Sequence, residues 1–218
     1  MRSASGTDAV GLNLEPSTIE SWMKFIRYHP DQAERYMDCF WGSQLDSKSR
    51  LLTELEKMPN MRGPLYIFGG WYGILTQMVL DSVAYNPEWI YSIDIDPQCE
   101  WVFNDVISKK YPATAVTADC ATYKYPIMPS VVINTVTEHL RQDDYDMWWG
   151  NVPRGTSFFL QGNDYFDNDE HVRCAKTLDD FVRMSNVENE CVEGMSQWTF
   201  SGPNDVDYER FMVWGVKK

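Results

Sequence analysis

The segment Leu65-Tyr66-Ile67-Phe68-Gly69-Gly70-Trp71-Tyr72-Gly73 decides the fold of this chain. Its four leading apolar residues predict a short buried strand, and the glycines that follow predict a tight turn. A helix is predicted next, over residues 72–84, where Ile74, Leu75, Met78 and Val79 recur at helical spacing. A strand, a glycine turn and a helix in this order are typical of a βαβ unit with a parallel sheet.

The same alternation continues toward the end of the chain. Further strands are predicted at 89–93, 114–117, 131–133 and 157–160, with helices after Pro97, around Trp148-Trp149 and over 177–184. Two late β runs, 191–200 and 208–216, have no long helix between them and predict an antiparallel hairpin. The sequence therefore predicts an α/β fold with a seven-stranded, mainly parallel sheet flanked by helices.

Residues 1–58 predict a helical section of a different kind. The first fifteen residues are small and polar and are expected to be loose. Ser17-Thr18-Ile19-Glu20 has the form of a capping box and predicts a helix start, and His29-Pro30-Asp31 predicts its end. Further helices are predicted around Tyr36 to Phe40 and from Asp46 to Met58. We therefore divide the chain into a helical cap, 1–58, and a Rossmann-like domain, 59–218.

Composition narrows the class of protein. The 218 residues carry 19 Lys and Arg against 32 Asp and Glu, a net charge of −13, which argues against unaided binding to nucleic acid or to an anionic membrane. The five cysteines are widely spaced without a C-x-x-C pair, so neither a disulfide framework nor a cysteine zinc site is predicted. No apolar run is long enough to span a membrane, and the start does not resemble a signal peptide. We expect a cytoplasmic protein.

Polar residues follow each of the first four predicted strands. In an open α/β sheet, ligands bind beyond the carboxyl ends of the strands, so these residues should meet at one edge. They are the glycine turn, Asp94 with Asp96, Asp119-Cys120, and the run from Asn134 to His139. A carboxylate after the second strand can accept both hydroxyls of a ribose. Each feature alone also permits a structural role: a turn for the glycines, a helix cap for Asp94 or Asp96, and an exposed turn for Asp119.

The order of these features resembles the class I S-adenosylmethionine-dependent methyltransferases, over roughly residues 60–218. Ser-Ile-Asp94-Ile-Asp96-Pro97 is similar to the ribose-binding segment of that family, and Glu138-His139-Leu140 is similar to the Glu-His pair that many small-molecule methyltransferases carry after strand four. The segments 134–139, 161–165 and 170–172 also resemble a methyltransferase-like group of tailed phages. The resemblance implies the class I methyltransferase fold, S-adenosyl-L-methionine as cofactor and, for a phage protein, a place in the host cytoplasm.

The resemblance also implies roles for individual residues. Glu138 and His139 are expected to be catalytic, as the base where the acceptor must lose a proton. The acceptor is expected to contact Gln161, Asn163, Tyr165 and His171. The cofactor is expected to bind Phe68, Gly69, Gly70, Trp71, Tyr72, Gly73, Asp94, Ile95, Asp119, Cys120, Asn134 and Thr135.

Two positions depart from the family pattern. Trp71 stands where the middle glycine is expected, and Ile67 stands where an acid is expected. Trp71 could pack over the methionine end of the cofactor, whereas Ile67 cannot anchor its ammonium group. A cofactor-binding or regulatory protein without turnover, and an enzyme that transfers another group of S-adenosylmethionine, therefore remain alternatives.

Other functions are less favoured. The spacing of Gly69, Gly70 and Gly73 does not fit the G-x-G-x-x-G of nicotinamide dehydrogenases. The segment 134–137 lacks the motif of DNA amino-methyltransferases, so the acceptor is expected to be a small molecule or a protein side chain. Duplex nucleic acid is not favoured as a partner, and no membrane partner is expected. The three histidines, His29, His139 and His171, each permit a structural role. Paired with Glu138 and Glu170, the last two permit a metal site, but their spacing does not favour it and no metal is expected. The oligomeric state is left open.

Overall fold

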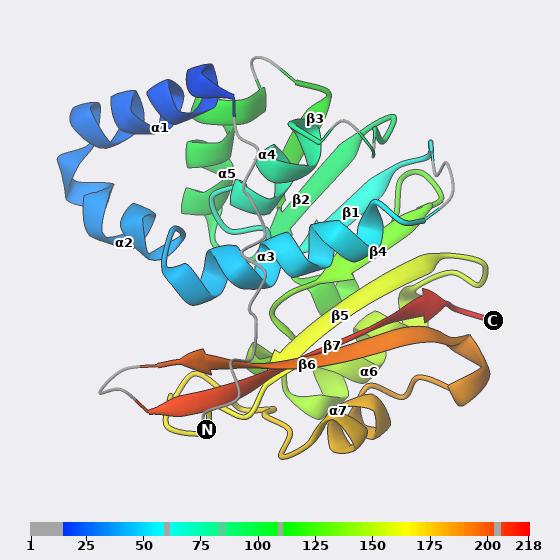
Figure 1. Cartoon of the computed structure of the whole chain (residues 1–218). Helices are drawn as coiled ribbons and strands as arrows, with labels where there is room; N and C mark the ends of the chain where they lie inside the picture. The colour runs from blue at the N-terminus through cyan, green and yellow to red at the C-terminus, as the bar shows by residue number, and fades with distance from the viewer. Residues whose placement is uncertain (1–14, 59–61, 83, 85, 109–110, 203–205) are drawn as a thin grey trace.

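The computed structural model describes residues 15–58, 62–82, 84, 86–108, 111–202 and 206–218, which form one α/β unit around a seven-stranded sheet (Figure 1). The strand order is β3-β2-β1-β4-β5-β7-β6. The first five strands are parallel, and β7 and β6 are antiparallel, which confirms the predicted sheet and terminal hairpin. The strands are β1 (Leu65–Phe68), β2 (Ile90–Asp94), β3 (Ala113–Thr117), β4 (Val131–Asn134), β5 (Ser157–Asn163), β6 (Val192–Ser201) and β7 (Asp207–Val216).

The central strand β1 explains why its sequence is apolar without interruption. It pairs with β2 on one side and with β4 on the other, and all four of its residues are buried. Leu65 and Ile67 pack into one hydrophobic core, and Tyr66 and Phe68 pack into the core on the opposite face. A strand covered by helices on both faces reads as a continuous apolar run, as β1 does.

The two faces of the sheet carry different helices (Figure 1). The core on one face includes side chains from α1 to α5, and the core on the other face is closed by α6 and α7. The helices are α1 (Pro16–Tyr28), α2 (Ala33–Asp38), α3 (Gly42–Leu55), α4 (Ile74–Leu80), α5 (Pro97–Phe103), α6 (Gln142–Asn151) and α7 (Leu178–Met184). None of the helices in the described ranges has the length and apolar character needed to cross a membrane.

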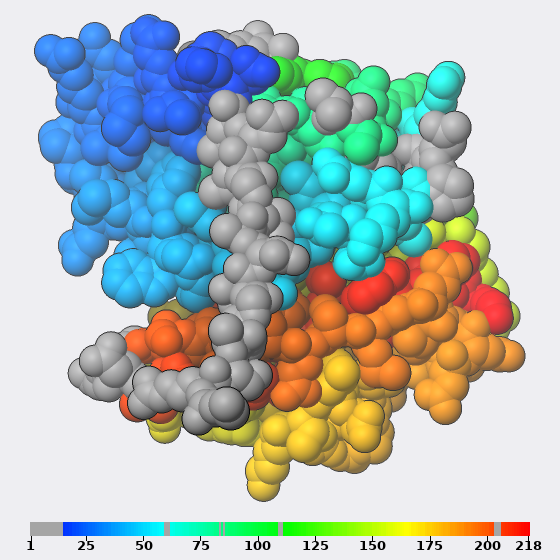
Figure 2. Space-filling view, in the orientation of Figure 1, coloured from blue at the N-terminus to red at the C-terminus, as the bar shows by residue number. Residues whose placement is uncertain are grey.

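The N-terminal helices share the core of the sheet. Trp22, Tyr36 and Leu51 belong to the same buried cluster as Ile67 of β1. Space-filling Figure 2 places α3 against the β6–β7 hairpin, in agreement with the Arg50 guanidinium, which lies 5.2 Å from the Trp198 ring. Residues 59–61, where the predicted domain boundary falls, and most of the predicted loose start lie outside the described residues, so this division remains a prediction.

Three predicted helix starts were wrong. The box at Ser17 does not cap α1, because the helix begins one residue earlier at Pro16, whose ring presets the helical φ, and its N-cap residue Glu15 makes no side-chain capping bond. The helix predicted over 72–84 spans only Ile74–Leu80, because Gly73 has a φ of +84°, in the left-handed region that a right-handed helix excludes. The helix predicted from Asp46 to Met58 is α3, which begins earlier, at Gly42, and ends at Leu55.

Gly70 allows a test of how tightly the glycine turn is packed. A Cβ at Gly70 would lie 1.9 Å from the Ser92 Oγ, so Gly70→Ala should lower the free energy of unfolding by about 1–3 kcal/mol. Adding Ser92→Gly removes that oxygen and should recover at least about 1 kcal/mol of the loss, measured as the coupling in a double-mutant cycle by urea denaturation.

Gly150→Ala is the matched control, because nothing lies within 4 Å of a Cβ at this position in α6. It should be neutral or stabilising by up to about 1 kcal/mol. Purely additive losses from Gly70→Ala and Ser92→Gly would contradict the predicted contact.

Candidate functional site

The glycine turn after β1 is held by the neighbouring strands. The Gly69 and Gly70 N–H groups both donate to the Ile93 carbonyl, at 2.9 and 3.1 Å. Gly69 has a φ of +70°, and a Cβ there would lie 2.1 Å from a Val136 methyl group. The packing of the β4 loop therefore already requires glycine at this position, and a Gly69→Val variant would strain the fold itself rather than only block a ligand.

Trp71 also has a positive φ, of 48°, which is uncommon for a bulky residue. Its N–H donates to the Asp94 Oδ2 at 3.0 Å, and the Asp94 Oδ1 accepts the Asp96 N–H at 3.1 Å. Asp94 thus fixes the turn after β1 to the end of β2. A carboxylate has about four acceptor positions, so Asp94 keeps two for a ligand.

Asp96 has the structural role that the sequence allowed. Its Oδ1 accepts the Gln98 N–H at 2.8 Å and caps α5, and its other oxygen pairs with Arg35 of α2. The capping bond and the Arg35 guanidinium hold the pKa of Asp96 below its ordinary value, against the effect of burial. Asp94 and Asp96 therefore have different partners and different roles. Asp96 caps α5, whereas Asp94 faces the glycine turn.

The ends of β3 and β4 supply the other polar residues of this edge. The Asp119 Oδ1 accepts the Ala121 N–H and starts the short 3-10 helix η3 (Cys120–Thr122), in which Cys120 is half-buried. The Asn134 Oδ1 accepts the Val136 N–H, while its buried Nδ2 finds no partner within the described ranges. The Thr135 Oγ1 donates to the Gly69 carbonyl at 3.3 Å and ties β4 to the turn.

Three of the predicted cofactor residues have side chains that do not point into the site: two are buried in the core and one is exposed to solvent. Phe68 is buried against Trp148, and Tyr72 is buried in a stack with Tyr36. Ile95 is 72% exposed beside Asp94. Phe68 and Tyr72 could therefore contact a cofactor only through their backbone, whereas Ile95 offers an apolar side chain.

A cavity of about 300 Å³ opens next to the glycine turn. It brings together seven residues from the three predicted groups, catalytic, cofactor-binding and acceptor-binding: Gly69, Trp71, Thr135, Glu138, His139, Tyr165 and His171. The other predicted site residues do not line it. The cavity therefore joins the turn after β1 to the Glu-His pair after β4, within the 300–1,000 Å³ typical of ligand pockets.

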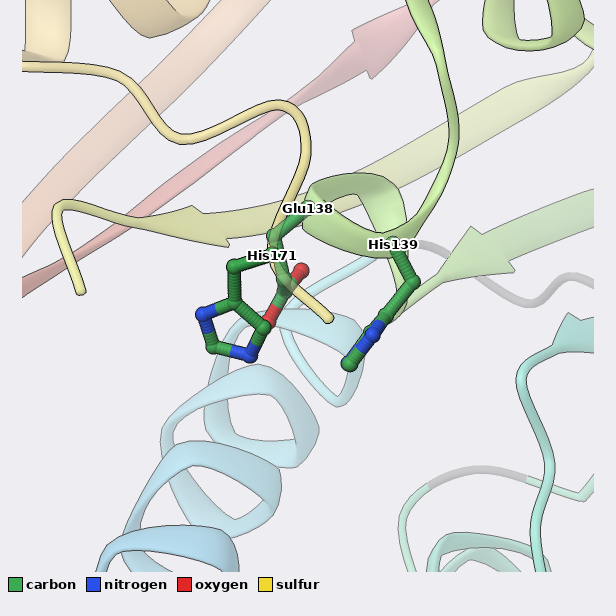
Figure 3. A group of neighbouring side chains, drawn as sticks. All are labelled: Glu138, His139 and His171. Carbon is green, nitrogen blue, oxygen red and sulfur yellow. The ribbon is translucent and has the colours of Figure 1, made fainter. Parts of the chain in front are cut away.

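Glu138, His139 and His171 form the polar centre of this cavity (Figure 3). The first two belong to the 3-10 helix η4 (Thr137–His139), and His171 comes from the loop after β5. One ligand atom of each lies within 4.8 Å of those of the other two, and the histidine rings meet edge to face with centroids 4.7 Å apart. Burial lowers the pKa of His171, which favours its neutral form.

Gln161 and Asn163 lie beneath the cavity and position other residues. The Asn163 Nδ2 donates to the Glu138 Oε1 at 2.7 Å. The Gln161 amide bonds to α3, accepting the Ser47 hydroxyl at 2.8 Å and donating to the Ser47 carbonyl at 3.0 Å. Both side chains are about 1% exposed, so the sequence-based assignment of acceptor contacts to them does not fit their placement.

Sequence reasoning missed the two cations of the cavity, Lys48 of α3 and Arg210 of β7. Both are buried, and burial together with the Arg210 charge lowers the pKa of Lys48 to about 8. Burial also lowers the pKa of Arg210, against the attraction of Glu138. The sequence pattern that could have identified them is a charged residue on the apolar face of an element. Lys48 shares a helix face with Leu45 and Leu51, and Arg210 shares a strand face with Tyr208 and Met212.

Other missed residues come from α2, α3 and β6, from the segment between α2 and α3, and from the loops after β5 and β6. They are Asp38, Trp41, Ser43, Gln44, Asn168, Phe200 and Gly202, and Val136 after β4 also lines the cavity. Several belong to the N-terminal section, which was expected to help shape the pocket but offered no motif to identify individual residues.

Solved structures similar to this one include several methyltransferases. The N-methyltransferase NodS from Bradyrhizobium japonicum WM9 has a TM-score of 0.59 at 12% identity, covering 80% of this chain and 97% of its own. The glycopeptide N-methyltransferase MtfA, solved with S-adenosyl-L-methionine, has a TM-score of 0.55 at 15% identity, covering 79% of this chain and 93% of its own. The YcgJ protein from Bacillus subtilis has a TM-score of 0.59 at 10% identity, covering 79% of this chain and 99% of its own.

This chain has the Rossmann-like methyltransferase fold. At these identities the likeness establishes the fold alone. No protein-family model matches the chain, and no curated protein sequence matches it. The resemblance to a tailed-phage group remains a prediction.

Lys48 should reduce the stability of the fold near neutral pH. Its pKa of about 8 lies below the ordinary 10.5, so between these values the unfolded chain binds a proton that the folded chain does not, and stability should rise with pH across this window. Lys48→Met should remove this rise and raise the free energy of unfolding at pH 7 by roughly 1–3 kcal/mol, measured by urea denaturation at pH 7 and 9.5.

Lys57→Met is the control, because Lys57 is exposed just after the same helix. It should change stability by less than about 0.5 kcal/mol at either pH. A destabilised Lys48→Met protein with an unchanged pH profile would show that the buried charge is fully compensated.

Proposed function

We propose that this protein is an S-adenosylmethionine-dependent methyltransferase whose acceptor is a small molecule or protein side chain that carries an anionic group. The observation that carries the proposal is the cavity lined both by the glycine turn, through Gly69 and Trp71, and by Glu138 and His139. A cofactor held at the turn would present its reactive end to the Glu-His pair. The methyltransferase structures of the same fold support this assignment.

The residues at the ends of β1 and β2 fit the cofactor. Asp94 is half-buried and keeps acceptor positions for ribose hydroxyls beyond its two backbone bonds. The exposed Ile95 side chain next to it suits the face of an adenine ring. Ile67 is fully buried in the core, so the ammonium group of the cofactor must be held by other residues than the usual acid.

Bound S-adenosylmethionine supplies an electrophilic methyl group on its sulfonium. The protein contributes chiefly by holding the acceptor in line with that group. For an acceptor that must lose a proton, Glu138 is placed to accept it through Oε2, and His139 lies beside it with its side chain in the same cavity. Asn163 holds the Glu138 carboxylate in place for this role.

Lys48 and Arg210 favour an acceptor with a carboxylate or phosphate group. Both are buried in the cavity wall, and the Arg210 Nε has no hydrogen-bond partner in the described part of the chain. Buried cations without close anionic partners are costly, and an anionic ligand would supply the missing partner.

Asp94 should carry much of the cofactor affinity. Asp94→Asn keeps an acceptor for the Trp71 N–H but loses the charge that binds ribose hydroxyls, so the Kd for S-adenosylhomocysteine should rise about 30- to 1,000-fold, since charged hydrogen bonds contribute about 1.5–3 kcal/mol each. Asp96→Asn, which keeps an oxygen to cap α5 but loses the ion pair with Arg35, should lower the free energy of unfolding by less than about 1 kcal/mol and leave the Kd within about threefold. Calorimetry gives both values, and wild-type affinity in folded Asp94→Asn would remove Asp94 from the cofactor site.

Turnover should depend on the Glu-His pair. The protein is incubated with S-adenosylmethionine and with small-molecule, protein or RNA fractions of a cell extract, and S-adenosylhomocysteine is measured. We expect accumulation with the small-molecule or protein fraction, a loss of about 10²- to 10⁴-fold in Glu138→Gln or His139→Asn, and unchanged cofactor affinity.

Lys48→Met separates acceptor binding from chemistry in the same assay. It should raise the KM for the acceptor fraction about 10- to 100-fold, the value of a charge-assisted hydrogen bond, while cofactor affinity stays the same. Cofactor binding without S-adenosylhomocysteine formation in any fraction would contradict the catalytic assignment and favour a binding protein.

A further inference from the structure

We infer that Glu138, His139 and His171 form a binding site for one divalent transition-metal ion such as Zn²⁺. The three side chains extend to the same side of η4, and their ligand atoms lie within 4.8 Å of one another (Figure 3). Two imidazoles and one carboxylate make up the protein ligands of many catalytic zinc sites and of the facial triad of iron sites, which leave positions open for a substrate.

The Glu138 carboxylate shows a missing partner. Its side chain is 4% exposed, and the Oε1 accepts the Asn163 amide at 2.7 Å, but the Oε2 has no hydrogen-bond partner among the residues that the structure describes. An unpaired buried carboxylate oxygen is expensive, so such an atom requires an explanation. A cation bound to Oε2 provides one.

The hydrogen bond of His171 leaves its second ring nitrogen, Nε2, free to bind a metal ion. The His171 Nδ1 lies 2.9 Å from the Tyr165 carbonyl oxygen. A carbonyl only accepts, so Nδ1 carries the proton and Nε2 of the neutral ring carries the free lone pair. Metal-binding histidines commonly donate their second nitrogen to a backbone carbonyl in this way, which fixes the ring orientation.

Main-chain bonds hold the two ligand-bearing segments together. The Val172 and Arg173 N–H groups both donate to the Glu138 carbonyl, at 2.9 and 3.0 Å, so the His171 loop is attached directly to η4. Metal bonds of about 2.0–2.1 Å would bring tetrahedral ligand atoms to about 3.3–3.4 Å apart. The His139 side chain is exposed, so its rotation can supply most of this adjustment.

Lys48 and Arg210 line the same cavity and oppose a dication, whereas Asp38 favours it. The competing explanation of Glu138 is that it serves only as a distant counter-charge to these two cations. The two explanations predict different responses of metal binding to Lys48→Met. The loss of a nearby positive charge strengthens the binding of a metal ion, but it has no such effect where no metal site exists.

The chemical consequence rests on the proposed function. An acceptor whose anionic group pairs with Lys48 and Arg210 would place a neighbouring oxygen or nitrogen within reach of the ion. The ion would then lower the pKa of an acceptor hydroxyl, whose proton passes to water, and leave the oxygen as nucleophile. In that case Glu138 and His139 act as ligands rather than as a base.

The test measures metal binding alone, without cofactor or acceptor. Chelator-treated full-length protein is titrated with Zn²⁺ by calorimetry and with Co²⁺ by ligand-field absorption. We expect one ion per chain, with an affinity weakened at least 10- to 100-fold by Glu138→Gln, His139→Asn or His171→Asn, and tightened several-fold by Lys48→Met. His29→Asn, which changes the third histidine in a turn after α1, is the matched control and should bind as the wild type does.

Several results would overturn the site: no saturable binding, equal binding in all three ligand variants, or no tightening in Lys48→Met. Thermal melting of each variant establishes that it folds. Were the buried Glu138 variant not to fold, the exposed His139→Asn would still decide. Because cofactor affinity is tested separately through Asp94, a failure here leaves the proposed methyl transfer standing, and a failure there leaves the metal site standing.

Discussion

Burial of opposite charges in one small cavity is the constraint on which the rest of the site depends. Lys48 and Arg210 enter it from α3 and β7, and Glu138 enters from η4. All three residues are at most 9% exposed. Such an arrangement lowers the stability of the protein without a ligand. Buried charges of this kind are found in proteins chiefly at functional sites, where a bound ligand balances them.

The polar residues beneath the cavity make this arrangement rigid. Gln161 ties α3 to β5 through Ser47, and Asn163 ties β5 to Glu138. Tyr165 accepts the ring N–H of His171 through its carbonyl. The bonds to Glu138 and His171 orient side chains that line the cavity, and the bonds between Gln161 and Ser47 join α3 to β5 beneath it. The end of β5 therefore affects the site without providing most of its surface.

The sequence predicted the features that depend on near neighbours. The apolar run of β1, the glycine turn and the cap at Asp96 each follow from a few adjacent residues, and the sheet was recognisable from their alternation. Only part of the cavity could be predicted, because Lys48 and Arg210 reach it from elements that are far apart in the sequence. Ser47, which precedes Lys48 in α3, bonds Gln161, 114 positions away, and Arg210, 163 positions away. Gln161 and Asn163 were misplaced for a related reason, since alternation does not tell which polar side chain of a strand end faces the cavity and which lies beneath it.

The placement of α3 has an evolutionary consequence. The helix supplies Lys48, Ser43 and Gln44 to the cavity wall, while the turn after β1 and the carboxylate of Asp94 belong to the sheet edge. Substitutions along the inner face of one helix can therefore alter the shape and charge of the cavity without disturbing that edge. Selection for a new ligand can act on the N-terminal section while the sheet edge is inherited unchanged.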